Sequence, residues 1–227
     1  MKNRRFFLLC SFLSNVLVFV MAFYAVGSSI RYHGGGEFNG TGFRTFRYFT
    51  TESNILAGIV SLLAAGFTLP VLLGKRERVP KFALVLKYVG SCAVALTFFV
   101  VLAFLGLIYG YGMMYRGASF YMHGIVPILA MVSWIVFDRG AHLKIQAFLF
   151  GLIPVVLYGV MYFVQVVLRG PARGGWEDFY AFTRGGKWWL SLMIVFAGAA
   201  VLCLLLLFLH NRCDRSGAAV QRETKRS

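Results

Sequence analysis

The sequence predicts an all-α integral membrane protein with six transmembrane helices. Of its 227 residues, 59% are hydrophobic and only 14% are charged, a composition outside that of ordinary soluble domains. Six stretches of about twenty residues carry almost no charge, and at about 1.5 Å per residue each is long enough to cross a hydrocarbon core of about 30 Å. Unpaired backbone groups are costly in lipid, so the spans are expected to be helical.

The first span is expected at residues 6–29. Its apolar stretch is longer than the roughly 7–15 residues of a signal peptide, which favours a membrane helix. The other spans are expected at residues 50–74, 83–108, 119–137, 145–168 and 187–210. Residues 1–210 then form one transmembrane domain, and residues 211–227 are expected to be a disordered basic cytoplasmic tail. The glycine-rich loop between the first two spans is expected to be mobile.

The distribution of Lys and Arg predicts the topology. One membrane face receives fifteen cations, which lie before the first span, between the second and third (with Lys87 counted here), between the fourth and fifth, and after the sixth. The opposite face receives eight. The positive-inside rule therefore predicts a multi-pass protein of the cell membrane with both termini in the cytoplasm. Topology and anionic lipids account for the net charge of +15, so we expect membrane lipids and no nucleic acid as partners. The oligomeric state stays open.

The sequence implies no metal and no cofactor. Three of the four cysteines, Cys10, Cys92 and Cys203, lie inside apolar spans, and Cys213 lies in the tail. Their spacing fits neither a disulfide framework nor a metal site.

The second span has one small, polar face. On a helical wheel of residues 50–65, this face holds Thr50, Ser53, Asn54, Ala57, Gly58, Ser61, Ala64 and Ala65. The opposite face holds Ile55, Leu56, Ile59, Leu62 and Leu63, and Thr51 and Glu52 begin on this bulky side. Small and polar residues of membrane helices face other helices, so Thr50 is expected to point inward. The alternative is that these groups only join neighbouring helices or cap the helix.

His123 lies in the first turns of the fourth span, four residues before Pro127. Proline lacks the N–H that would bond the His123 carbonyl, so the helix is expected to loosen at the histidine. Irregular backbone at this depth is tolerated only inside the protein or beside a wet cavity, and a membrane-buried histidine suggests a functional site. Residues expected at the same depth are Tyr158, Tyr162, Gln165 and the loop "GGWEDFYAF". We therefore predict a pocket that opens to the outer leaflet.

Three motifs carry a resemblance to a known family: "RYFTTESN" at the second span, "HGIVP" in the fourth, and an aromatic "W-x-x-F-Y-x-F" after the fifth. They resemble a bacterial six-helix membrane family of the Pr-six-Pr type, which is distantly similar to the animal androgen-induced-gene-one and ADTRP proteins. Those animal proteins are intramembrane hydrolases of fatty acid esters of hydroxy fatty acids. The resemblance implies Thr50 as nucleophile and His123 as its base. The His-to-Pro spacing here is one residue shorter, and Ala181 stands where those relatives tend to carry proline.

The leading hypothesis is an intramembrane hydrolase of fatty acyl esters that uses Thr50 and His123. Candidate oxyanion or substrate-lining groups are Asn54, Arg47, Ser53, Tyr158, Tyr162 and Gln165, together with backbone N–H groups at the start of the second span. Asp178 or Glu52 could orient the histidine, and the alternative is that each is a solvated or interfacial charge. The first alternative is a non-catalytic membrane protein that binds or transports a lipid or small solute. The second is a structural component that assembles through small-residue faces such as Gly106-x-x-x-Gly110.

Overall fold

A computed structural model gives the structure of residues 2–31 and 42–223, with side chains described for 4–31 and 42–214. The described residues contain six helices that are long and apolar enough to cross a membrane, and no strand. The prediction of six helical spans is therefore confirmed. Most of the glycine-rich loop expected to be mobile, residues 32–41, lies outside the described residues.

Three of the six spans are continuous α-helices and three contain wider, π-helical turns. The first, second and sixth are α1 (Lys2–Arg31), α2 (Phe49–Leu72) and α9 (Trp188–Glu223). The third joins α3 (Lys81–Val100), π-helical η2 (Val101–Leu105) and α4 (Gly106–Tyr109). The fourth joins α6 (Ala118–Phe120), π-helical η3 (Tyr121–Ile125), α7 (Val126–Val132) and π-helical η4 (Ser133–Phe137). The fifth joins α8 (Ala147–Phe163) and π-helical η5 (Val164–Arg169). Short helices in the connections are η1 (Gly42–Arg47), α5 (Tyr111–Met114), η6 (Pro171–Arg173) and η7 (Arg184–Gly186).

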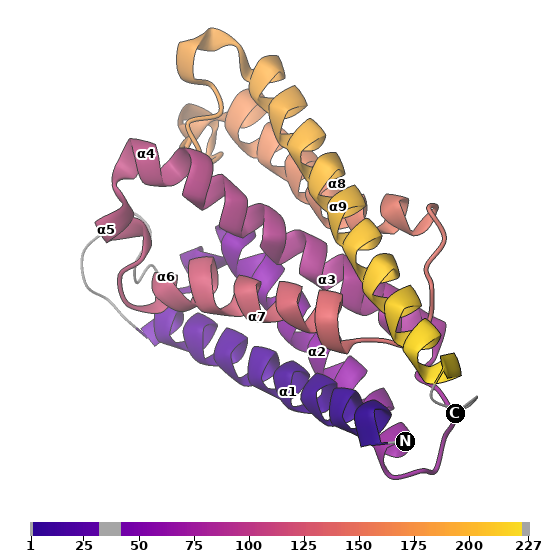
Figure 1. Ribbon diagram of the computed structural model, residues 1–227. Coiled ribbons are helices and arrows are strands. Elements are labelled where there is room, and N and C mark those ends of the chain that lie inside the picture. The colour runs from indigo at the N-terminus through magenta and orange to yellow at the C-terminus, as the bar shows by residue number, and fades with distance from the viewer. Residues whose placement is uncertain (1, 32–41, 224–227) are drawn as a thin grey trace.

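Four spans form a bundle, and the last two lie against one of its sides. α1, α2, α3 and the fourth span surround a common interior, while α8 and α9 pair with each other beside α3 (Figure 1). Both ends of the chain lie at the same end of the bundle (Figure 1). We call this the terminal end, and the opposite one the distal end.

The small, polar face of α2 is buried as the helical wheel predicts. Ser53, Asn54, Ala57 and Ser61 are at most 1% exposed, whereas Ile59, Leu62 and Leu63 are exposed. Small residues let α2 approach α1 and α3 closely.

The wheel is wrong about Thr51, which is 1% exposed and more deeply buried than Thr50 at 8%. The reason is η1, the short helix before α2. Its residue Thr45 is buried, and the hydroxyl groups of Thr45 and Thr51 lie 2.9 Å apart in a hydrogen bond. A helical wheel of α2 alone cannot show that Thr51 is covered by η1, which precedes the helix.

The predicted loosening of the fourth span at His123 is confirmed. Residues Tyr121–Ile125 form the π-helical turn η3, and α7 begins at Val126 with Pro127 in its first turn. Proline cannot donate a backbone hydrogen bond, so the preceding turn widens.

The sixth helix extends further than expected. Instead of ending near residue 210, α9 continues to Glu223, through much of the segment for which we expected disorder. Two side chains hold it to the connection before α8: Asn211 pairs with the backbone of Leu143 through both its oxygen and its nitrogen, and Asp214 accepts the Gly140 N–H. The tail residues 224–227 lie outside the described part of the chain.

α3 packs tightly against α2 at Gly90. A Cβ at this position would lie 2.5 Å from Val60 Cγ2 and 3.1 Å from the Ala57 Cα. We expect Gly90→Ala to lower the free energy of unfolding by about 1–3 kcal/mol through overpacking. Thermal unfolding in detergent micelles measures this. The control is Gly66→Ala in α2, where a Cβ would meet nothing within 4 Å. Equal unfolding temperatures for both variants would contradict the proposed contact.

Candidate functional site

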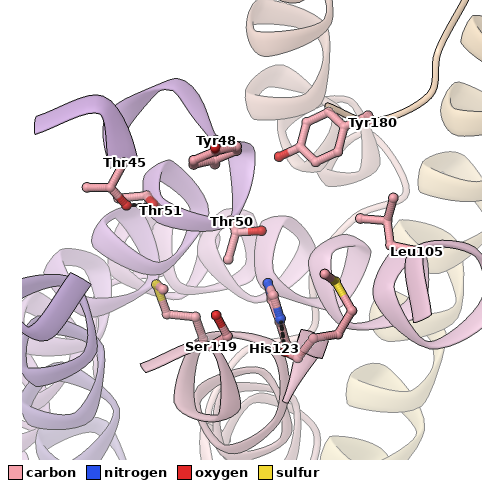
Figure 2. A pocket seen from close by; sticks show the side chains of 10 residues that line it. Thr45, Tyr48, Thr50, Thr51, Leu105, Ser119, His123 and Tyr180 are labelled. Atoms are coloured by element: carbon pink, nitrogen blue, oxygen red, sulfur yellow. Dashed lines mark hydrogen bonds between the residues drawn. The ribbon is translucent and has the colours of Figure 1, made fainter. Parts of the chain in front are cut away.

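A small, partly open pocket lies at the distal end of the bundle. Four parts of the chain meet there: the start of α2 with η1, the end of the third span with α5, the start of the fourth span, and the loop before α9. The lining residues are Thr45, Tyr48, Thr50, Thr51, Leu105, Met114, Ser119, Met122, His123 and Tyr180. Thr50 and His123, predicted from separate spans, therefore line the same pocket (Figure 2).

His123 is held in one orientation by the end of α5. Its Nδ1 lies 2.6 Å from the carbonyl oxygen of Met114, and the side chain is 5% exposed. A carbonyl oxygen can only accept a hydrogen bond, so Nδ1 carries the ring proton. In the neutral ring, the lone pair is then on Nε2. Figure 2 shows this second ring nitrogen on the side of the ring that faces Thr50.

Thr50 is the second residue of α2, and its side chain lies between Tyr180 and His123 (Figure 2). Its backbone carbonyl accepts bonds from the Asn54 amide at 2.7 Å and the Ser53 hydroxyl at 3.1 Å. Among the described residues, no hydrogen bond joins the Thr50 hydroxyl to the His123 ring. Threonine in a helix divides between two χ1 rotamers, so a rotation can redirect the hydroxyl toward Nε2.

Tyr180 places a third polar group in the pocket, with its hydroxyl directed toward Thr50 (Figure 2). The hydroxyl oxygen accepts the Phe49 N–H at 2.9 Å, a donor at the start of α2 that has no partner within the helix. Burial raises the pKa of Tyr180 to about 12, against the opposing effect of hydrogen bonds with Tyr158, Phe49 and Thr50. The phenol thus keeps its proton at neutral pH and can donate it to a ligand.

Asp178 organises the loop that carries Tyr180. Its carboxylate accepts bonds from the Phe182 N–H, from both the N–H and the hydroxyl of Thr183, and from the Tyr162 hydroxyl, all at 2.7–2.9 Å. Burial alone would raise the pKa of Asp178, but these hydrogen bonds lower it below its ordinary value. The Tyr162 hydroxyl in turn accepts the Tyr180 N–H at 3.1 Å.

The same bonds enclose a strained residue. Ala181, next to Tyr180, has φ +53°, the one non-glycine residue with positive φ in the described chain. Such a conformation costs about 1–3 kcal/mol and persists only where its surroundings impose it. Here the Asp178 carboxylate bonds the two residues that follow Ala181, and the Asp178 carbonyl accepts the Ala181 N–H at 3.2 Å.

Asn54 and Ser53, two of the predicted oxyanion or lining residues, lie behind the pocket and do not line it. The Asn54 amide donates to the carbonyls of Thr50 and Met122, at 2.7 and 3.1 Å, and so joins α2 to the turn that carries His123. Ser53 bonds the Thr97 hydroxyl at 2.9 Å. Because the Asn54 donors are already used, the side chain supports the site and does not supply an oxyanion donor.

The remaining predicted residues also lie outside the pocket lining. Arg47 contributes its backbone carbonyl, which accepts the Tyr158 hydroxyl at 2.6 Å, and so joins α8 to η1. Tyr162 supports the Asp178 loop. The side-chain oxygen of Gln165 is buried without a partner in the described chain, away from the pocket lining.

The groups proposed to orient His123 do not do so. Glu52 is exposed, and Asp178 is engaged with its own loop. The orienting group is the Met114 carbonyl. Sequence reasoning missed this contact because a backbone carbonyl leaves no residue signature.

Sequence reasoning placed the loop "GGWEDFYAF" near the pocket but did not single out Tyr180 within it. The available signal was the close spacing of Asp178, Tyr180 and Thr183 in one short loop, a pattern typical of turns held by a carboxylate.

Comparison of the chain with protein-family models, curated proteins and solved structures gave no match. The described residues contain no cluster of three His, Cys, Asp or Glu side chains that could hold a metal ion. The chemistry of this site is therefore argued from its own side chains.

We expect Asp178→Asn to loosen the Tyr180 loop, because charged acceptors bind N–H donors more strongly than neutral ones. The Phe182 and Thr183 amide hydrogens should exchange about 10-fold faster or more at neutral pH, as measured by hydrogen exchange and mass spectrometry. The control, Glu177→Gln, removes an exposed neighbouring carboxylate and should leave exchange unchanged.

The same loop has a predictable pH dependence. The native pKa of Asp178 lies below its ordinary 3.8, so the carboxylate's stabilisation is fully present above pH 3.8 and is lost as pH falls through the lower native value. After correction for the intrinsic exchange rate, the Phe182 and Thr183 amide hydrogens of the wild type should exchange as fast as those of Asp178→Asn only in that acid range. Equal protection of both proteins at neutral pH would contradict this role of Asp178.

Proposed function

We propose that this protein is an intramembrane hydrolase of fatty acyl esters, with Thr50 as nucleophile and His123 as general base. The observation that carries the proposal is the bond from His123 Nδ1 to the Met114 carbonyl, because it leaves the Nε2 lone pair on the side of the ring that faces Thr50. A nucleophilic hydroxyl, a base near it and a third group that orients the base are the parts needed for covalent acyl transfer.

In the first half-reaction, the Thr50 Oγ attacks the carbonyl carbon of the ester. His123 Nε2 takes the hydroxyl proton as the bond forms, and the carbonyl oxygen becomes an oxyanion. When this intermediate collapses, the bond to the alcohol oxygen breaks and Nε2 returns the proton to the leaving alcohol. The product is an acyl ester on Thr50.

In the second half-reaction, water replaces the alcohol. His123 Nε2 accepts a proton from the attacking water, and the acyl-threonine passes through a second oxyanion. The fatty acid leaves as the proton returns to the Thr50 oxygen. The enzyme is then restored, and the net reaction consumes one ester and one water.

Tyr180 takes the place of Asn54 as the proposed oxyanion donor. Its oxygen accepts the Phe49 N–H, so its own proton remains available to an oxygen bound in the pocket. The Asp178 loop holds the phenol in place before substrate arrives. Pre-positioned donors of this kind require little reorganisation during the reaction.

The pocket lining also fits a lipid ester. Hydroxyl groups in the lining come from Ser119 and from the threonines of η1 and α2. Leu105, Met114 and Met122 supply apolar surface. Once the pocket opens to admit a lipid, a polar ester group and part of an acyl chain would each find suitable contacts. With both termini in the cytoplasm, as the positive-inside rule predicts, the distal pocket lies in the outer leaflet of the cell membrane, and membrane lipids would be its substrates.

A non-catalytic protein that binds or transports a lipid or small solute is the second candidate. It is favoured by one observation, the lack of a hydrogen bond between Thr50 and His123 in the described chain. Catalytic hydrogen bonds are often long before substrate binds, which is why we place hydrolysis first. A fluorophosphonate probe separates the two: it labels Thr50 in the hydrolase, whereas the binding protein takes up lipid without label or turnover.

We expect Thr50→Ala to abolish ester turnover and His123→Ala to lower it by about 10²–10⁴-fold, because general-base assistance is worth that much. Both variants should fold as the wild type does. The assay is a lipidomic comparison of membranes that contain each protein, which also identifies the substrate. The matched control is Thr68→Ala, a buried threonine of α2 whose hydroxyl donates to the Ala64 carbonyl of its own helix. Full activity of Thr50→Ala would exclude this nucleophile.

Tyr180→Phe keeps the ring but removes the donor. We expect kcat to fall by about 10²–10³-fold with little change in KM, because an oxyanion forms only along the reaction path. Steady-state kinetics on the substrate identified above measures this. A rise in KM at constant kcat would instead assign Tyr180 to substrate binding alone.

A further inference from the structure

A second polar cluster is buried at the terminal end of the bundle, away from the pocket. It contains one cation, one anion and five neutral polar side chains from the four helices of the bundle. We call it the polar layer, and it consists of Ser11, Ser14 and Asn15 from α1, Ser61 from α2, Lys87 from α3, Ser133 from η4, and Asp138 directly after η4.

Asp138 is 4% exposed and is surrounded by neutral donors. Its carboxylate accepts the Ser11 hydroxyl at 2.6 Å, the Asn15 amide at 2.7 Å and the Ser133 hydroxyl at 2.9 Å. In the described part of the chain, no cationic side chain lies within 4 Å of it. Its charge is thus solvated by hydrogen bonds from α1 and the fourth span, not by direct contact with a cation.

Lys87 is the corresponding cation, and it is only 1% exposed. The positive-inside count placed it at the membrane face, but the structure places it in the interior of the bundle. Its ammonium donates to the Ser61 hydroxyl at 2.8 Å. An ammonium has three N–H donors, and no other described side chain or backbone group accepts from the remaining two. Ser91 lies one turn further along the same face of α3, and its hydroxyl donates to the Ala130 carbonyl at 3.4 Å, so Lys87 faces the part of the fourth span that leads to Asp138.

An unpaired acceptor lies in the same layer. Asn15 is fully buried, and its amide nitrogen donates to Asp138, but its Oδ1 has no hydrogen-bond partner in the described structure. The layer therefore contains two unpaired donors on Lys87 and an unpaired acceptor on Asn15. A polar group buried without a partner is strongly unfavourable, because it has lost its hydrogen bonds to water.

An apolar layer separates this cluster from the pocket. Its six residues come from the same four helices and are at most 1% exposed: Val18, Ala22, Ala57, Val94, Val126 and Ala130. A ligand of the polar layer is therefore distinct from a ligand of the pocket.

We propose that the polar layer binds water, which bridges the Lys87 ammonium to Asn15 Oδ1 and the Asp138 carboxylate and makes a hydrated ion pair that locks the four helices together. Water needs two to four polar partners, and Lys87, Asn15 and Asp138 supply both donors and acceptors. The ammonium repels a metal cation and the carboxylate repels an anion, so a neutral, small ligand fits best.

The locking role is tested by a double-mutant cycle on the full-length protein in detergent micelles, with Lys87→Met, Asp138→Asn and the double variant. Each single change leaves the other charge buried and uncompensated, and should lower the unfolding temperature by roughly 5–15 °C. The double variant should lose less than the sum of the two. Thr68→Val, a buried hydroxyl outside the layer, is the control and should change little. Additive losses, or a neutral Lys87→Met, would overturn the ion pair.

Bound water is tested on the wild-type protein itself, so the test does not depend on a destabilised variant. Infrared spectra in deuterated water should contain O–D stretching bands of strongly hydrogen-bonded water that shift when the water carries the heavy oxygen isotope. Asn15→Leu should remove these bands, whereas Thr68→Val should keep them. If the wild type shows no isotope-sensitive band, or Asn15→Leu retains it, the bridging water is contradicted.

Discussion

The hydrogen bond between His123 Nδ1 and the Met114 carbonyl is the contact on which the candidate site depends. It needs a widened turn in the fourth span, which Pro127 causes, and it needs α5 to bring a free carbonyl to the distal end of the bundle. Without it, either ring nitrogen could carry the proton and the ring could turn. With it, one nitrogen is committed to the protein and the other is available to the pocket that Thr50 lines.

The site is supported by side chains that do not touch the pocket. The Asn54 amide ties the backbone of Thr50 to that of Met122, so the nucleophile candidate and the histidine turn move together. The Asp178 carboxylate imposes the strained backbone of Ala181 and, through Tyr162, holds Tyr180. The apolar layer lies between the pocket and the polar layer at the terminal end. This division lets one small bundle hold two polar regions that differ in composition: hydroxyl groups and a histidine in one, and a buried lysine and aspartate in the other.

The spans, the inward face of α2 and the loosened turn at His123 could all be predicted from the sequence, because hydropathy, helical periodicity and the missing N–H of proline act locally. Three features could not. Thr51 is buried by η1, a contact that a single-helix wheel leaves out. His123 is oriented by a backbone carbonyl, which every residue has. Lys87 counts as a surface cation by its position near the start of α3, and only the packing of four helices shows that its ammonium is buried beside Ser61. Asn54 and Arg47 were predicted as oxyanion donors because both side chains carry N–H groups. In the structure, the Asn54 amide joins α2 to η3, and the Arg47 carbonyl joins η1 to α8.

The most direct test of this account is the tautomer of His123. Nitrogen-15 NMR of the protein with labelled histidine, assigned by comparison with His123→Gln, reports which ring nitrogen carries the proton. The account predicts a proton on Nδ1 and an unprotonated Nε2. A proton on Nε2 with Nδ1 free would mean that the ring does not bond the Met114 carbonyl, and the arrangement of base and nucleophile described above would be contradicted.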